Sequence, residues 1–166
     1  MRLGDYIKVR TGKLDANAAV EGGQYPFFTC SKENLKIDDY AFDCECVLLA
    51  GNGELNVKYY NGKFNAYQRT YVIEALDKTD VCTKYIYYFF KWYLTYLRHQ
   101  SIGGVVKYIK LNNINDVAIN LPSVIRQKEI TDELEKIEEV INSCQNQINF
   151  LDELIKSRFI GWRVAA

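Results

Sequence analysis

The chain has 166 residues and a formal net charge of zero, with 21 basic and 21 acidic side chains. This length allows one sizeable core rather than two large domains. Because the net charge is neutral, the overall charge does not indicate a nucleic-acid partner. The longest stretch without a charged residue, 140–151, is too short and too polar to span a membrane. The N-terminus lacks the apolar stretch of a signal peptide, so we expect a cytoplasmic protein without membrane spans.

Residues that could support catalysis or bind a metal are few. The only histidine is His99, the cysteines have irregular spacing without a Cys-x-x-Cys pair, and no nucleophile-elbow, phosphate-loop or methyltransferase motif occurs. We therefore expect no catalytic residues, metal site or cofactor. The cysteines are expected to be reduced and buried, as is usual in the cytosol; they are Cys30, Cys44, Cys46, Cys82 and Cys144.

The first part of the chain, 1–121, mixes short extended segments with one helix. A strand is expected at 46–50, and Asn61-Gly62 between extended runs predicts a tight hairpin turn because both residues tolerate positive φ. Another strand follows in 67–76, and late strands are expected in 101–111 and 116–122. Asp80 could cap a helix over 81–98, whose aromatic residues on most sides indicate that it is largely enclosed. The pattern is typical of an α/β or mixed α+β domain.

The second part, 122–160, is one helical pattern with an apolar residue every three or four positions, and 161–166 is expected to form a tail. Ser123 is a plausible N-cap, and the helix from 124 to about 159 would be roughly 50 Å long. It could pack on its own domain, but a domain of ~120 residues is only about 30 Å across, so a coiled-coil partner is favoured. The seam residues are Ile130, Leu134, Ile137, Ile141, Cys144, Ile148, Leu151 and Ile155.

Charge is unevenly distributed along the first part. The segments 56–73 and 81–115 contain basic residues, tyrosines and asparagines but no acidic residue. Together they could form a basic face that suits a phosphate backbone and base edges. The alternative is a solvated face on strands whose tyrosines belong to the core.

Several segments, in order, resemble the specificity subunit of type I restriction–modification systems. They are "RLGDYIKVRTGK", "GGQYPFFTCS", "DCECVLLAGNGELNVKYYNGKFNAYQRTYVI", "KYIYYFFKW" and "GGVVKYIKLNNINDVAINLPSVIRQKEI", followed by the heptad helix. The resemblance runs from Arg2 to about Phe159, and Pro122, Gln127 and Ile130 match the family's junction between domain and helix. It implies a target recognition domain that reads half of a bipartite DNA site, and a long helix that sets spacing and docks the modification subunit.

This chain departs from the family in having one such domain and one helix where members usually have two of each. The resemblance therefore implies a half-subunit or a fragment. A half with an unpaired seam is expected to form a homodimer, most simply antiparallel, that reads an interrupted palindrome on double-stranded DNA. Restriction and methylation belong to other subunits of such complexes, so the chain is expected to be non-catalytic.

Candidate DNA-contacting residues come from the basic segments and from the polar loop "FFTCSKEN". Lysines would contact phosphates, while Asn, Gln and Arg have the hydrogen-bonding groups that read adenine and guanine. Alternation along a strand implies that about half of residues 57–71 point into the core. The candidates are Thr29, Ser31, Lys32, Lys58, Lys63, Asn65, Tyr67, Gln68, Arg69 and Lys107.

Two other functions stay open at this level. A coiled-coil adaptor that binds only protein would use the same heptad seam, with the basic stretches serving solubility. A self-contained nuclease or methyltransferase would require catalytic motifs that the sequence does not display. Salt-dependent DNA binding by the assembled complex, lost when Lys58 and Lys63 are changed to alanine, would separate the DNA-reading function from the adaptor.

Overall fold

The computed structural model describes the backbone of residues 1–164 and the side chains of residues 1–159. The chain divides into two compact units, Met1–Lys128 and the residues from Glu129 onward. The long helix α3, Val124–Val164, therefore contributes its first residues to the first unit. The predicted boundary at 121 lies seven residues earlier, at the point where the regular helix is about to begin.

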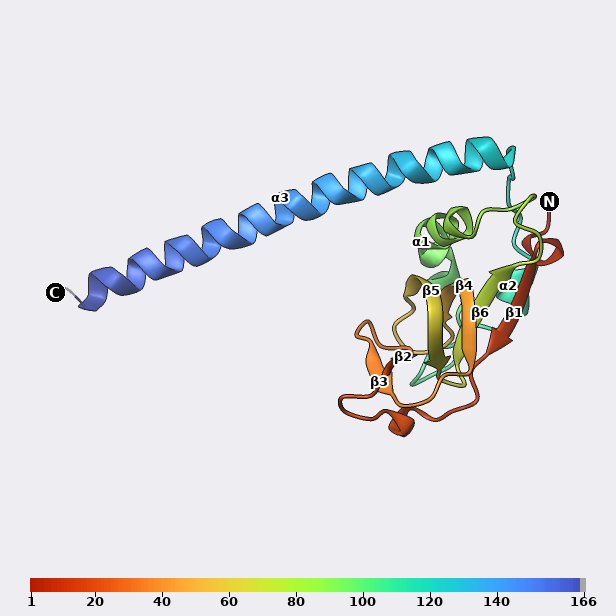
Figure 1. Cartoon of the computed structure of the whole chain (residues 1–166), viewed down its shortest axis with the longest axis horizontal. Helices are drawn as coiled ribbons and strands as arrows, with labels where there is room; N and C mark the ends of the chain where they lie inside the picture. Colours follow the sequence, from red (N-terminus) through yellow and green to blue (C-terminus); the bar gives the residue numbers. More distant parts are fainter. Residues whose placement is uncertain (165–166) are drawn as a thin grey trace. The chain divides into compact units, whose positions relative to one another are not determined.

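The first unit is built on a six-stranded mixed sheet (Figure 1). The strand order is β1-β6-β4-β5-β2-β3, and all neighbours are antiparallel except β2 and β5. This architecture confirms the predicted mixed α+β class. The strands are β1 (Ile7–Thr11), β2 (Tyr25–Phe28), β3 (Leu35–Ile37), β4 (Phe42–Ala50), β5 (Val57–Ala66) and β6 (Thr70–Ala75).

Strand β4 pairs with β5 and β6 along its two edges, and both of its faces are covered. Val47 and Leu49 belong to the apolar cluster that includes α1, whereas Cys46 and Leu48 belong to a second cluster with Phe64. Successive side chains of a strand point to opposite faces, so a strand buried on both sides appears as a continuous apolar run. The predicted strand at 46–50 is the C-terminal half of β4.

Helix α1, Thr83–Gln100, packs on β4 and β5 through Ile86, Phe90 and Leu97. Two predictions about it were wrong. Trp92 and Tyr96 are 63% and 51% exposed, so the aromatic residues are not all enclosed. The helix begins after Cys82 without a side-chain cap, and the carbonyl of Asp80 accepts a hydrogen bond from Gln127 instead of its carboxylate capping the helix.

The expected hairpin turn at Asn61-Gly62 does not exist. Strand β5 runs straight through both residues, which pair with Glu45 and Cys44 of β4. Cross-strand pairing overrides the local turn preference here because eight residues of β4, Phe42 to Leu49, pair with β5. Gly62 keeps a φ of 133°, a conformation that favours glycine, just before the end of β5 that pairs with β2. The chain reverses instead in the segments 51–56 and 67–69.

The expected late strands are reduced to isolated pairs. Ile102 and Tyr108 pair with each other within the 102–108 loop, and Ala118 pairs with Arg2. The Gly103-Gly104 dipeptide disfavours an extended strand because glycine loses the most conformational freedom on ordering. Short helical turns complete the unit, namely η1 (Leu3–Asp5), η2 (Ala16–Ala18) and α2 (Asn112–Asn115).

Helix α3 confirms the strongest sequence prediction (Figure 1). The amide of Arg126 donates to the hydroxyl of Ser123 at 3.4 Å, as expected of an N-cap. The helix has 41 residues and continues to Val164, past the predicted end at about Phe159. The predicted tail is therefore helical up to 164, and its last two residues lie outside the described part. Within the described chain, no helix is apolar and long enough to cross a membrane.

Candidate nucleic-acid interface

Three loops are joined by backbone hydrogen bonds at one end of the sheet. The amide of Gly51 donates to the carbonyl of Arg69 at 2.8 Å, and the amide of Ile109 donates to the carbonyl of Gly51 at 2.9 Å. The amide of Gly53 donates to the carbonyl of Lys107, also at 2.9 Å. The segments 51–56, 67–69 and 101–109 therefore form one continuous surface although they are distant in sequence.

This surface contains a cleft of about 530 Å³. Two of the predicted base-reading residues, Gln68 and Arg69, line it and are exposed. Neither side chain makes a hydrogen bond or ion pair within the described part of the chain, so both can bind a ligand. Lys107, adjacent in sequence to two lining residues, is exposed beside it. The lining residues are Asn52, Tyr67, Gln68, Arg69, Val106 and Tyr108.

The polar loop at 29–34 adjoins the same surface. The Cys30 thiol lies 3.5 Å from the carbonyl of Arg69, and the Asn56 amide group donates to the carbonyl of Cys30 at 2.8 Å. Ser31 is exposed, and its hydroxyl accepts from the amide of Glu33. Lys32 is exposed but forms an ion pair with Glu54 at 2.7 Å. This pair neutralises an acidic residue in the loop next to the cleft.

The Lys58 side chain forms hydrogen bonds with this loop. Its ammonium donates to the carbonyl of Ser31 and to the side-chain oxygen of Asn34, both at 2.8 Å. Burial lowers the pKa of Lys58 from its ordinary value, because a partly buried ammonium loses hydration. Lys58 thus has two bonds within the protein, and its expected role as a phosphate contact competes with them.

Two of the candidate residues are buried. Thr29 is 7% exposed and accepts a hydrogen bond from the amide of Ser31. Asn65 is 6% exposed, accepts from the amide of Ala66 and donates to the carbonyl of Asp39. Both side chains complete the hydrogen bonding of nearby backbone, as buried polar groups generally do. Thr29 and Asn65 therefore have a structural role, and little of either side chain is exposed for contact with DNA.

Lys63 lies apart from the cleft. Its ammonium is 4.6 Å from the centre of the Tyr40 ring, and Tyr40 in turn packs against Tyr25. A hydrogen bond with Tyr40 raises the pKa of Lys63 above its ordinary value. The expected basic face is thus divided, with Arg69 and Lys107 at the cleft and Lys63 among tyrosines elsewhere.

Asn52, Val106 and Tyr108 line the cleft but were not among the sequence candidates. Asn52 lies between two glycines in the loop after β4, and Val106 and Tyr108 follow the Gly103-Gly104 pair. Glycine-flanked loops that end strands and helices commonly carry binding residues. The strand expected over 101–111 did not anticipate that Val106 and Tyr108 lie in a loop at the cleft.

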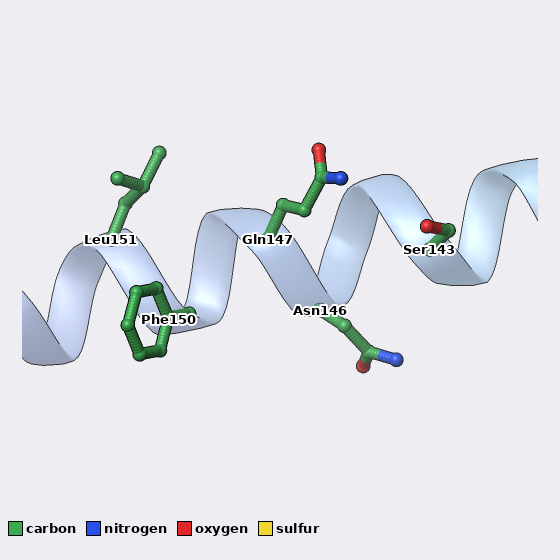
Figure 2. Close-up of a pocket in the computed structure, with 5 residues that line it drawn as sticks. All are labelled: Ser143, Asn146, Gln147, Phe150 and Leu151. Carbon is green, nitrogen blue, oxygen red and sulfur yellow. The ribbon is translucent and has the colours of Figure 1, made fainter.

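On α3, the seam is exposed from Ile137 to Ile155, whereas Ile130 and Leu134 are half-buried. Ile141 and Ile155 are 59% and 60% exposed, and Cys144 is also exposed, contrary to the expectation that every cysteine is buried. An open pocket on this helix is lined by Phe150 and Leu151 together with the polar side chains that Figure 2 labels. Exposed hydrophobic residues on α3 are Ile125, Ile137, Val140, Ile141, Ile148, Phe150, Leu151, Leu154, Ile155 and Phe159.

Residues 1–151 match the model of the type I restriction modification DNA specificity domain. The chain belongs to this family. It is 40% identical over 156 residues to the specificity subunit of the type I restriction enzyme EcoDI from Escherichia coli. The match covers 94% of this chain but 34% of that subunit, so the chain spans about a third of the relative's length.

Solved structures of specificity subunits share the fold. The S subunit of a type I restriction–modification system from M. genitalium superposes with a TM-score of 0.73 at 17% identity, covering 84% of this chain and 38% of that one. The HsdS subunit from Thermoanaerobacter tengcongensis gives 0.61 at 16% identity, covering 86% and 38%. These findings confirm the expected family and fold class, and they place the chain with specificity subunits rather than with the catalytic ones.

Proposed function

We propose that this chain reads one half of a bipartite DNA target and, paired with a second copy, directs a modification subunit to an interrupted palindrome. The observation that carries the proposal is the exposed cleft at Gln68 and Arg69, in a chain that belongs to the DNA specificity family. Acting on cellular DNA, the complex would work in the cytoplasm. A restriction subunit would join the same complex.

Within the cleft, Arg69 and Gln68 are the proposed base readers. A guanidinium can donate two hydrogen bonds to guanine, and a glutamine amide can both donate to and accept from adenine. Lys107 is the proposed phosphate contact beside them, with Ser31 and Lys32 at the margin. Lys63, outside the cleft, would contact DNA only if the duplex extended across the β2–β3 side. Tyr67 would position a base or sugar against its ring.

The charges of α3 favour an antiparallel homodimer. Residues 128–140 carry six acidic and two basic side chains, whereas residues 151–159 carry two of each. A parallel pair would bring the two acidic halves together, and like charges across a coiled coil are destabilising. An antiparallel pair places each acidic half beside a balanced one. It also separates the two readers, which a bipartite site requires.

The coiled-coil adaptor is the competing function, and the exposed apolar surface of α3 would serve it equally well. The two differ in what the cleft does. An adaptor requires no sequence-dependent contact at Arg69, whereas a DNA reader does. The near-zero net charge also implies that the chain alone binds DNA weakly and that the modification subunit contributes basic surface.

The experiment compares Arg69→Ala with Arg2→Ala in the assembled complex. Both variants remove one exposed arginine, but Arg2 pairs with Asp116 and does not line the cleft. Fluorescence anisotropy on cognate and random duplexes at fixed salt should show a loss of about 10- to 100-fold on the cognate site for Arg69→Ala only. Equal loss on both duplexes would contradict base reading. Absence of DNA binding by the wild-type complex would favour the adaptor.

A further inference from the structure

The 102–108 loop presents an apolar tip beside the cleft. Val105 is fully exposed, and its neighbour Val106 is 54% exposed while also lining the cleft. Ile102, at the base of the loop, is 45% exposed. Single exposed apolar residues are ordinary on protein surfaces, but here three of them are gathered on one loop next to a polar site.

The backbone holds this loop in a defined conformation. Ile102 and Tyr108 exchange two backbone hydrogen bonds, of 3.0 and 2.9 Å. The next residue, Ile109, is 3% exposed, and its carbonyl accepts a hydrogen bond from the Tyr71 hydroxyl at 3.1 Å. Together with the bond from Gly53 to Lys107, these contacts fix the loop to the cleft while its tip points outward.

Gly103 is required for this geometry. Its φ of 116° favours glycine, and a Cβ at this position would lie 2.5 Å from the carbonyl oxygen of Val106. Gly104, by contrast, has open space around the position of a Cβ. The tight turn therefore depends on one glycine, and its consequence is that Val105 stands at the tip.

The surroundings indicate which partner the tip meets. No acidic residue occurs between Val81 and Asn115, and the acidic side chain of the adjoining loop, Glu54, is paired with Lys32. A polyanion can therefore approach the tip without repulsion. The apolar group that duplex DNA offers in its major groove is the C5-methyl of thymine, which small apolar side chains contact. The side chains that typically separate base pairs are Phe, Leu, Ile, Met and Pro, a set that does not include valine.

Resting on the proposed DNA-reading function, we propose that Val105 contacts a thymine methyl group in the major groove, next to the bases read by Gln68 and Arg69. The loop thereby adds a thymine preference to the half-site. Lys107, two residues on, contacts the phosphate that flanks this thymine.

The test is a double-mutant cycle between the protein and the DNA methyl group. The probe is a duplex with the cognate site in which each thymine in turn is replaced by deoxyuridine, bound by the complex assembled with its modification subunit. At one position in each half-site, replacing thymine by deoxyuridine should weaken wild-type binding about fivefold. Val105→Ala should cause a similar loss on the unmodified duplex and no further loss on that deoxyuridine duplex. Val20→Ala, an exposed valine that does not line the cleft, should leave every affinity unchanged.

The contrary outcomes separate this inference from the proposed function. The thymine contact is overturned if the Val105→Ala complex binds the unmodified duplex as tightly as the wild type. It is also overturned if the affinity lost through Val105→Ala adds to the affinity lost through deoxyuridine at every position. In both cases DNA reading stands. A wedge would give a different result: 2-aminopurine fluorescence would report an unstacked base-pair step that is absent with Val105→Ala, and the double-mutant cycle would show no coupling to a thymine methyl group. That result would overturn the inference. If the wild-type complex does not distinguish cognate from random DNA, both the proposed function and this inference are overturned.

Discussion

The two units of this chain satisfy their apolar residues in different ways. In the first unit, β4 is covered on both faces, and the polar loops at the sheet end are fixed by backbone hydrogen bonds. In the second, Ile141, Ile148 and Ile155 of α3 are each more than half exposed. The first unit therefore completes its core alone, whereas the second presents an apolar seam that we propose is covered by another helix.

Gln127 shows how the start of α3 is attached to the first unit. It is completely buried, and its side-chain oxygen accepts from the amide of Cys82 at 2.8 Å. Its amide group donates to the carbonyls of Asp80 and Pro122 at 3.0 and 2.8 Å. One side chain thus satisfies the start of α1 and the segment before α3. This gives a physical reason for the glutamine that the sequence resemblance placed at the junction.

The largest predicted effect concerns the seam. Changing Ile141 and Ile148 together to aspartate places two charges where an apolar contact is proposed, so self-association should be abolished. Analytical ultracentrifugation should show a dimer for the wild type and a monomer for this variant. The matched control adds the same charge at Asn142 and Asn149, exposed residues that lie off the seam. A seam variant that still dimerises would contradict the proposed pairing.

A smaller effect, on the stability of the first unit, is expected from Gln127→Ala. The substitution leaves three backbone groups without their partner, and each buried unsatisfied group costs about 1–3 kcal/mol. We expect the free energy of unfolding to fall by about 3 kcal/mol in urea denaturation. Gln24→Ala, at an exposed position of the same unit, should change it by less than about 0.5 kcal/mol. If the two variants were equally stable, the three bonds would not anchor the junction.

The smallest predicted effect is on the salt dependence of DNA binding, and it comes from Lys107→Ala. Removing one phosphate contact should reduce the slope of log affinity against log salt by about 0.9 for each half-site, with little change in sequence preference. DNA titrations of the assembled complex between low and physiological salt measure this slope. Lys8→Ala, an exposed lysine on β1, provides the control. An unchanged slope for Lys107→Ala would remove this residue from the interface.

Features set by local sequence were predictable, and those set by distant partners were not. The heptad spacing of α3, its Ser123 cap and the strand at 46–50 follow from neighbours in the chain. Asn61-Gly62 has a strong local turn preference, but its pairing with β4 prevails. Asn65 and Arg69 differ little in sequence context, yet the first is buried on β5 and the second is exposed in the following turn. Val106 and Tyr108 line the cleft because their loop contacts other loops that lie about fifty residues away in the sequence.

We propose that two copies of this chain read a symmetric DNA target. The most direct measurement is methylome sequencing of cells that express the chain with its modification subunit and no other specificity subunit. We expect new methyladenine at an interrupted palindrome, lost in the seam variant and altered in Arg69→Ala. An asymmetric motif would contradict the homodimer, and no new methylation from an assembled complex would contradict DNA reading itself.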